Sequence, residues 1–178
     1  MSFLSLVPIY MGDRQALLRR LSDRIERTFH LTVRPRAPWF DPEIAFDASR
    51  CQYNSSQLLR QLLSDPYSDG ARILGVTSRD LFSPALTYVF GEAQLDGRAA
   101  VVSIDRLRNE AYGFPRNDRL LCERSEKEAI HELGHVYGLV HCRSAACVMQ
   151  ASTFVEHIDF KSVQFCTRCL GNLAARKK

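Results

Sequence analysis

The 178-residue sequence has no apolar run that approaches the roughly 20 residues needed to cross a bilayer, so we expect no membrane partner. The first ten residues lack a basic start and contain Pro8, and we therefore expect no signal peptide. Internal repeats and low-complexity segments are also missing, so a repeat architecture is not expected. The net charge of +4 is dispersed, apart from the C-terminal run Arg176-Lys177-Lys178, and we expect no nucleic-acid partner.

The composition, 46% hydrophobic and 25% charged, is typical of a globular chain. A chain of this length buries about 70% of its unfolded surface, which is enough for a real core. We therefore expect one domain over residues 1–178, and a monomer.

Apolar periodicity predicts alternating strands and helices in the first 77 residues. The expected elements are a strand at 4–10, a helix capped by Asp13 that buries Leu17, Leu21, Ile25 and Phe29, a strand at 31–36, a helix from Ser55 or Ser56 to Leu63, and a strand at 72–77. Residues 35–54 hold three prolines and show no period, so we expect a loop there. This order predicts a mostly parallel sheet joined by right-handed crossovers.

Two more extended runs, 86–93 and 99–104, flank an Asp-Gly pair, which is typical of a hairpin. One of them should be an antiparallel edge strand. A helix is expected from about 118 to 137, capped by Asn117 or Asp118; a capping box of Ser125 with Glu128 would instead support a later start. The predicted fold class is thus mixed α/β, with a twisted, mostly parallel sheet.

Three of the five histidines fall in the segment 131–141, whose sequence is HELGHVYGLVH. His131 and His135, four apart on a helix, lie roughly 40° apart around its axis and can face one ion. Gly138 suits a sharp turn that brings His141 back as a third ligand. Three neutral histidines leave one tetrahedral position for water, as in a catalytic zinc site, and Glu132 is placed to take a proton from that water.

A helix could also carry such histidines on an ordinary polar face. We favour the metal site because five specified positions agree with one chemical purpose, and because this spacing is the extended signature of metzincin peptidases.

Four of the six cysteines have metal-ligand spacing: Cys142, Cys147, Cys166 and Cys169. Four thiolates make a closed tetrahedral site, so we expect a structural zinc ion that ties the loop after His141 to a C-terminal helix. Disulfides are disfavoured without an export signal, and a redox-active pair lacks the strand that precedes it in thioredoxins. These observations favour the reducing cytoplasm. Cys51 and Cys122 are expected to be buried thiols without a role.

The chain resembles the archaemetzincins (archaelysins), a metzincin subfamily of zinc metallopeptidases. The resemblance is carried by the segments 131–142, 147–149 and 165–169, and extends to 89–93, 101–103 and 127–129. It implies a metzincin-like fold with an N-terminal subdomain (1–138) and a small zinc-stapled C-terminal subdomain (139–178). Two zinc ions per chain are implied, together with Met149 in the turn beneath the catalytic metal. On spacing alone Met149 is a buried core methionine.

The expected activity is hydrolysis of a peptide or protein substrate, with Glu132 as general base. An extended substrate could pair with the edge strand, and the candidate binding residues are Thr87, Tyr88, Val89, Phe90, Gly91 and Glu92. That strand could equally be a plain sheet edge. An electrophilic helper cannot be chosen among Tyr88, Tyr112, Tyr137 and His157.

Two other functions remain open. One is a two-zinc binding or scaffold protein with little or no proteolytic activity, against which the intact Glu132 argues. The other is a nucleic-acid-binding zinc ribbon built on the four cysteines and the basic tail 176–178. Such a site would need aromatic residues interleaved with the basic ones, and these are missing.

Overall fold

The computed structural model describes residues 3–66 and 70–176. In chain order the elements are β1 (Phe3–Ile9), α1 (Gln15–Phe29), β2 (Thr32–Pro35), η1 (Pro42–Ala45), β3 (Phe46–Asp47), β4 (Gln52–Asn54), α2 (Ser55–Leu63), β5 (Arg72–Thr77), β6 (Leu81–Ser83), β7 (Leu86–Val89), β8 (Gly91–Ala93), β9 (Ala99–Ser103), η2 (Asp105–Leu107), η3 (Asn109–Tyr112), α3 (Asp118–Val136), α4 (Val155–Phe160) and α5 (Thr167–Arg176). Among these helices, none has the length and apolar character to cross a membrane.

The main sheet has the strand order β2-β1-β5-β9-β8. β1, β2, β5 and β9 run parallel, and β8 pairs antiparallel with β9 at the edge. The predicted mixed α/β class with an antiparallel edge strand is therefore confirmed.

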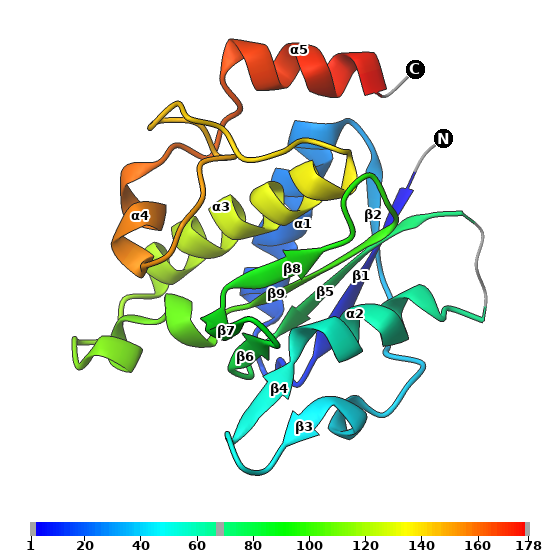
Figure 1. Cartoon of the computed structure of the whole chain (residues 1–178), viewed down its shortest axis with the longest axis vertical. Coiled ribbons are helices and arrows are strands. Elements are labelled where there is room, and N and C mark those ends of the chain that lie inside the picture. The colour runs from blue at the N-terminus through cyan, green and yellow to red at the C-terminus, as the bar shows by residue number, and fades with distance from the viewer. Residues whose placement is uncertain (1–2, 67–69, 177–178) are drawn as a thin grey trace.

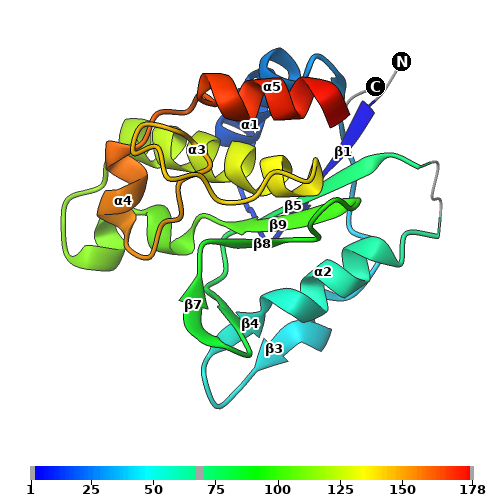
Figure 2. The same cartoon turned by 45° about the horizontal axis from the view of Figure 1, so that its top comes forward.

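The core lies on both faces of this sheet because side chains alternate along each strand. Leu4 and Leu6 of β1 point into a cluster with α1 and α3, whereas Val7 and Ile9 point into a second cluster with α2. Figures 1 and 2 show α1 and α3 over one face and α2 over the other.

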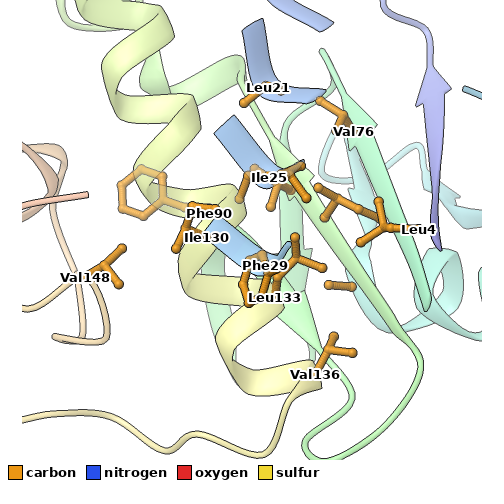
Figure 3. Packing of buried hydrophobic residues seen from close by; sticks show 14 of the residues in the cluster. Leu4, Leu21, Ile25, Phe29, Val76, Phe90, Ile130, Leu133, Val136 and Val148 are labelled. Atoms are coloured by element: carbon orange, nitrogen blue, oxygen red, sulfur yellow. The ribbon is translucent and has the colours of Figure 1, made fainter. Parts of the chain in front are cut away.

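Helices α1 and α3 meet through fully buried aliphatic side chains. Ile25 of α1 and Ile130 and Leu133 of α3 are 0% exposed, and Figure 3 shows them converging beside the sheet. Each such side chain stabilises the fold by about 1.5–3 kcal/mol relative to exposure, so α3 is held rigidly against the sheet.

Helix α3 begins where the longer prediction put it. Asn117 Oδ1 accepts a hydrogen bond from the Leu120 N–H at 3.0 Å, which caps the helix at its first turn. The alternative capping box is wrong, since Ser125 lies inside the helix and donates to the Leu121 carbonyl.

Three expectations need correction. Asp13 does not cap α1: its N-cap residue is Arg14, with no side-chain capping bond. The region 35–54 is not only loop, because η1, β3 and β4 lie within it. The run 86–93 is not one strand: it divides at Phe90 into β7 and β8.

The errors at 35–54 and 86–93 share a physical cause. β3, β4, β6 and β7 form a second, four-stranded sheet. Their two to four residues are too short to show a period of two along the sequence.

Candidate functional site

The C-terminal end of α3 turns the chain so that three histidines meet. The N–H of Gly138 donates to the His135 carbonyl (2.8 Å) and that of Leu139 to the Gly134 carbonyl (2.9 Å), the two bonds of a Schellman motif. Gly138 has a φ of +80°, a left-handed conformation that costs glycine nothing. The chain therefore reverses directly after the helix and brings His141 back to face it.

His131, His135 and His141 offer ring nitrogens that all lie within 4.8 Å of one another. Nδ1 of His131 lies 2.8 Å from the Val148 carbonyl, and Nδ1 of His135 lies 2.7 Å from the Leu139 carbonyl. A carbonyl only accepts, so both Nδ1 atoms carry the proton and both Nε2 atoms present a lone pair. These two Nε2 atoms are 3.1 Å apart.

The geometry fits a zinc ion. Two nitrogens in a tetrahedral zinc site lie about 3.3 Å apart for the usual Zn–N bond, close to the spacing seen here. Burial lowers the pKa of His131 well below its ordinary value, and it also lowers the pKa values of His135 and His141. The rings are thus kept neutral, the form that binds metal.

A cavity of about 580 Å³ opens over these histidines. We call it the cleft. One wall is the stretch 86–93, which we call the strand wall. A second wall is the segment 151–154, which we call the loop wall. The remaining lining residues come from α3 and the turn that follows it: Glu128, His131, Glu132, His135 and His141.

Glu132 is buried, with 6% of its surface exposed, and lines the cleft beside His131. Burial raises the pKa of its carboxyl well above the ordinary value; the charge of Glu128 acts in the same direction, and Lys161 opposes both. The strand wall approaches Glu132 closely at Gly91. A Cβ atom added to Gly91 would lie 2.7 Å from Glu132 Cγ and 2.8 Å from the Val101 carbonyl oxygen, so only glycine fits there.

Close to Glu132 lies a buried ion pair that the sequence did not predict. Glu128 stands one helical turn before Glu132, and its Oε1 is 2.8 Å from Nζ of Lys161. The side chain of Lys161 is 0% exposed, and its Nζ also donates a hydrogen bond to the Gln150 carbonyl at 3.2 Å. The i, i+4 spacing of the two glutamates was a visible signal, but nothing local in the sequence pointed to Lys161.

Met149 is fully buried. A Cβ atom on Gly134 would come within 3.1 Å of Met149 Cε, which places this methionine against α3 at Gly134. Its carbonyl accepts from the Cys142 N–H at 2.9 Å, linking this turn to the start of the cysteine cluster.

The four predicted cysteine ligands meet in one place, with their sulfur atoms within 4.8 Å of one another. Sγ of Cys142 and Sγ of Cys166 are 3.8 Å apart, which equals the roughly 3.8 Å spacing in a tetrahedral zinc–thiolate site with Zn–S bonds of about 2.3 Å. Hydrogen bonds from the Ser144 N–H and from Arg168 outweigh burial, which would raise the pKa of Cys142. They lower this pKa to about 6 and so favour the thiolate. This donor set fits zinc as well.

Only some of the other residues predicted to act at the site lie in the cleft. The residues from Thr87 to Glu92 all line the cleft, as does Tyr88 among the four possible helpers. Tyr137 instead stacks on Phe29, with ring centroids 4.9 Å apart. We expected both remaining cysteines to be buried. This is wrong for Cys51, which is exposed, whereas Cys122 is half-buried.

Comparisons with known proteins agree with this geometry. The model of Peptidase family M54 matches residues 42–175. The chain is 44% identical over 135 residues to the archaemetzincin of Methanocaldococcus jannaschii, covering 76% of this chain and 73% of that protein.

Solved structures have the same fold. The crystal structure of archaemetzincin from Methanopyrus kandleri matches with a TM-score of 0.87 and 34% identity, over 99% of this chain and 95% of that one. A zinc-dependent peptidase from Methanocorpusculum labreanum matches with a TM-score of 0.81 and 28% identity, over 96% of this chain and 99% of that one. The chain therefore belongs to Peptidase family M54, the archaemetzincin family of zinc-dependent metallopeptidases.

Proposed function

We propose that this peptidase hydrolyses peptide bonds in the cleft, with His131, His135 and His141 as ligands of the catalytic zinc and Glu132 as general base. One observation carries the assignment: Nε2 of His131 and Nε2 of His135 lie 3.1 Å apart with their lone pairs free for a metal, because each Nδ1 proton is already hydrogen-bonded to a carbonyl. Zinc held there would lower the pKa of a water molecule and polarise a carbonyl group.

The chain's own residues supply the proton transfers. Glu132 faces the cleft, accepts a proton from the attacking water and passes it to the leaving amine. The hydrogen bonds that the two Nδ1 atoms donate to the Val148 and Leu139 carbonyls hold the helical imidazoles in one tautomer and one orientation.

The substrate would lie extended along the strand wall. β8 is the last strand of the main sheet, so its outer edge offers backbone donors and acceptors to a peptide. Glu92 is held on this wall by Ser55 and Ser56; Ser56 Oγ lies 2.9 Å from Glu92 Oε1. We assign Thr87 to Glu92 to substrate binding on this basis.

A second zinc ion, bound by Cys142, Cys147, Cys166 and Cys169, would be structural, because four thiolates leave no position for substrate. Two zinc ions per chain are therefore proposed, with Met149 as the buried residue of a metzincin-type turn. The proposed organisation is one monomeric domain, residues 1–178, whose subdomains meet at Gly138. Thiolates of this kind require a reducing compartment, which favours the cytoplasm.

The test combines metal analysis with hydrolysis of a mixed peptide library by wild type and Glu132→Gln. We expect the variant to keep its zinc and lose at least about 10²-fold in kcat/KM, the usual contribution of a positioned general base. Glu123→Gln is the matched control, because Glu123 lies on the same helix but pairs with Arg119 near the surface. Hydrolysis at the wild-type rate by Glu132→Gln would show that another group activates the water.

A further inference from the structure

The two walls of the cleft are joined by a hydrogen bond. The hydroxyl of Tyr88, on the strand wall, donates to the carbonyl of Thr153, on the loop wall, at 2.7 Å. Both residues line the cleft. We call this bond the crossbar; it connects residues 65 positions apart in the sequence.

Tyr88 is held firmly on its side. Its ring packs edge-on against Phe90, with centroids 5.6 Å apart, and the Arg106 guanidinium lies 4.3 Å from its ring centre. Arg106 is fixed in turn by two hydrogen bonds to Asp80, of 2.6 and 2.7 Å. The hydroxyl is thus presented to the cleft by a ring with little freedom to turn away.

Thr153 is held from the opposite side. Its N–H donates to Nδ1 of His157 in α4 at 3.2 Å. Helix α4 is itself tied to α3, because Arg124 binds the Asp159 carboxylate with two bonds of 2.7 Å and Lys127 donates to the Ile158 and Asp159 carbonyls. The carbonyl of Thr153 is therefore a fixed acceptor.

We propose that the crossbar limits substrate length: a peptide can extend past Tyr88 between the two walls only by breaking this bond. The inference rests on the proposed function of the cleft. A short or chain-terminal peptide fits without disturbing the crossbar, whereas a longer chain must replace it. One intramolecular hydrogen bond contributes about 0.5–1.5 kcal/mol, so the penalty should be about two- to tenfold in kcat/KM.

The test uses Tyr88→Phe, which keeps the ring and its packing and removes only the hydroxyl. Quenched fluorescent peptides of one core sequence would be compared with the same core lengthened by several residues at its N-terminal or its C-terminal end. Tyr112→Phe is the control, because its hydroxyl also donates to a backbone carbonyl, that of Arg106 at 2.9 Å. Dissociation constants would be measured in parallel on the Glu132→Gln background.

We expect wild type to disfavour one of the two extensions. In Tyr88→Phe the long-to-short ratio of kcat/KM for that extension should rise about two- to tenfold, and the long-to-short ratio of dissociation constants should fall by the same factor. Tyr112→Phe should show the wild-type ratio. An active Tyr88→Phe enzyme with the wild-type ratio would overturn the length limit alone. A wild-type protein that cleaves neither short nor long peptides would overturn the proposed function, and the length limit with it.

Discussion

The side chain of Glu132 reaches the cleft only because its neighbour on the strand wall has no side chain. An alanine Cβ at position 91 would come within 3 Å of both Glu132 Cγ and the Val101 carbonyl oxygen. Relieving both contacts requires the Glu132 side chain to shift and the edge strand β8 to move away from the Val101 carbonyl of β9. Glycine at this position thus fixes the place of the proposed general base.

Gly91→Ala should therefore lower kcat about 10- to 100-fold while zinc content stays at the wild-type level, since displacement of a catalytic group by about 1 Å costs rates of this order. Gly171→Ala is the control, because a Cβ atom there meets nothing within 4 Å. Steady-state kinetics beside metal analysis would measure the effect. Wild-type kcat in Gly91→Ala would mean that Glu132 can shift without consequence.

The ion pair of Glu128 and Lys161 gives a prediction about stability. Removing one member of a buried pair leaves the other charge unpaired and costs about 3–5 kcal/mol. Lys161→Met should accordingly lower the melting temperature by about 6–20 °C. The double variant Lys161→Met/Glu128→Gln should recover much of this loss, because no charge is then left alone.

Calorimetry on the single and double variants would measure the coupling. Arg119→Met serves as the control, since Arg119 pairs with Glu123 at a side-chain exposure of 85% and should contribute less than about 1 kcal/mol. If the double variant were no more stable than Lys161→Met, the pair would not be coupled.

At the scale of elements, helix α3 was the most predictable part of the molecule. Its cap, its length and the turn at Gly138 each follow from a local sequence rule, and the three histidines converge as a consequence. The four cysteines also converge, although the two pairs are distant in the sequence. This too was predictable, because the spacing within each pair matches that of metal ligands.

The strand wall was only partly predictable. A run such as 86–93 reads as one strand, yet Leu86–Val89 pairs with β6 in the small sheet while Gly91–Ala93 pairs with β9 in the main one. Which partner a short strand takes depends on contacts distant in sequence, and local pattern cannot supply them. The same holds for Lys161 and Thr153, whose roles arise from segments that meet only in the folded chain.

At the scale of the whole molecule, the sequence after Gly138 has little core of its own. Its buried residues join the cluster formed by α1 and α3, and Phe165 packs edge-on against Phe29 of α1 with centroids 6.1 Å apart. The proposed structural zinc would add to these contacts, since metal binding at such a site contributes directly to folding free energy.

Metal analysis should therefore find two zinc ions per chain of unequal lability. Mild chelation should remove the ion at the open histidine site and leave the one at the closed cysteine site. Loss of both ions under the same mild conditions would argue that the cysteine site is open to exchange.

Cys166→Ser leaves three thiolates and should release the C-terminal segment, which limited proteolysis would detect as new cleavage after residue 142, together with a lower melting temperature. Cys51→Ser is the matched control, because Cys51 is an exposed free thiol outside the cluster. The variant His131→Ala/His135→Ala should lose one zinc ion and resist proteolysis as wild type does, since the closed site would still hold its metal. An unchanged melting temperature and proteolysis pattern in Cys166→Ser would show that the four sulfur atoms do not hold the C-terminal segment through zinc.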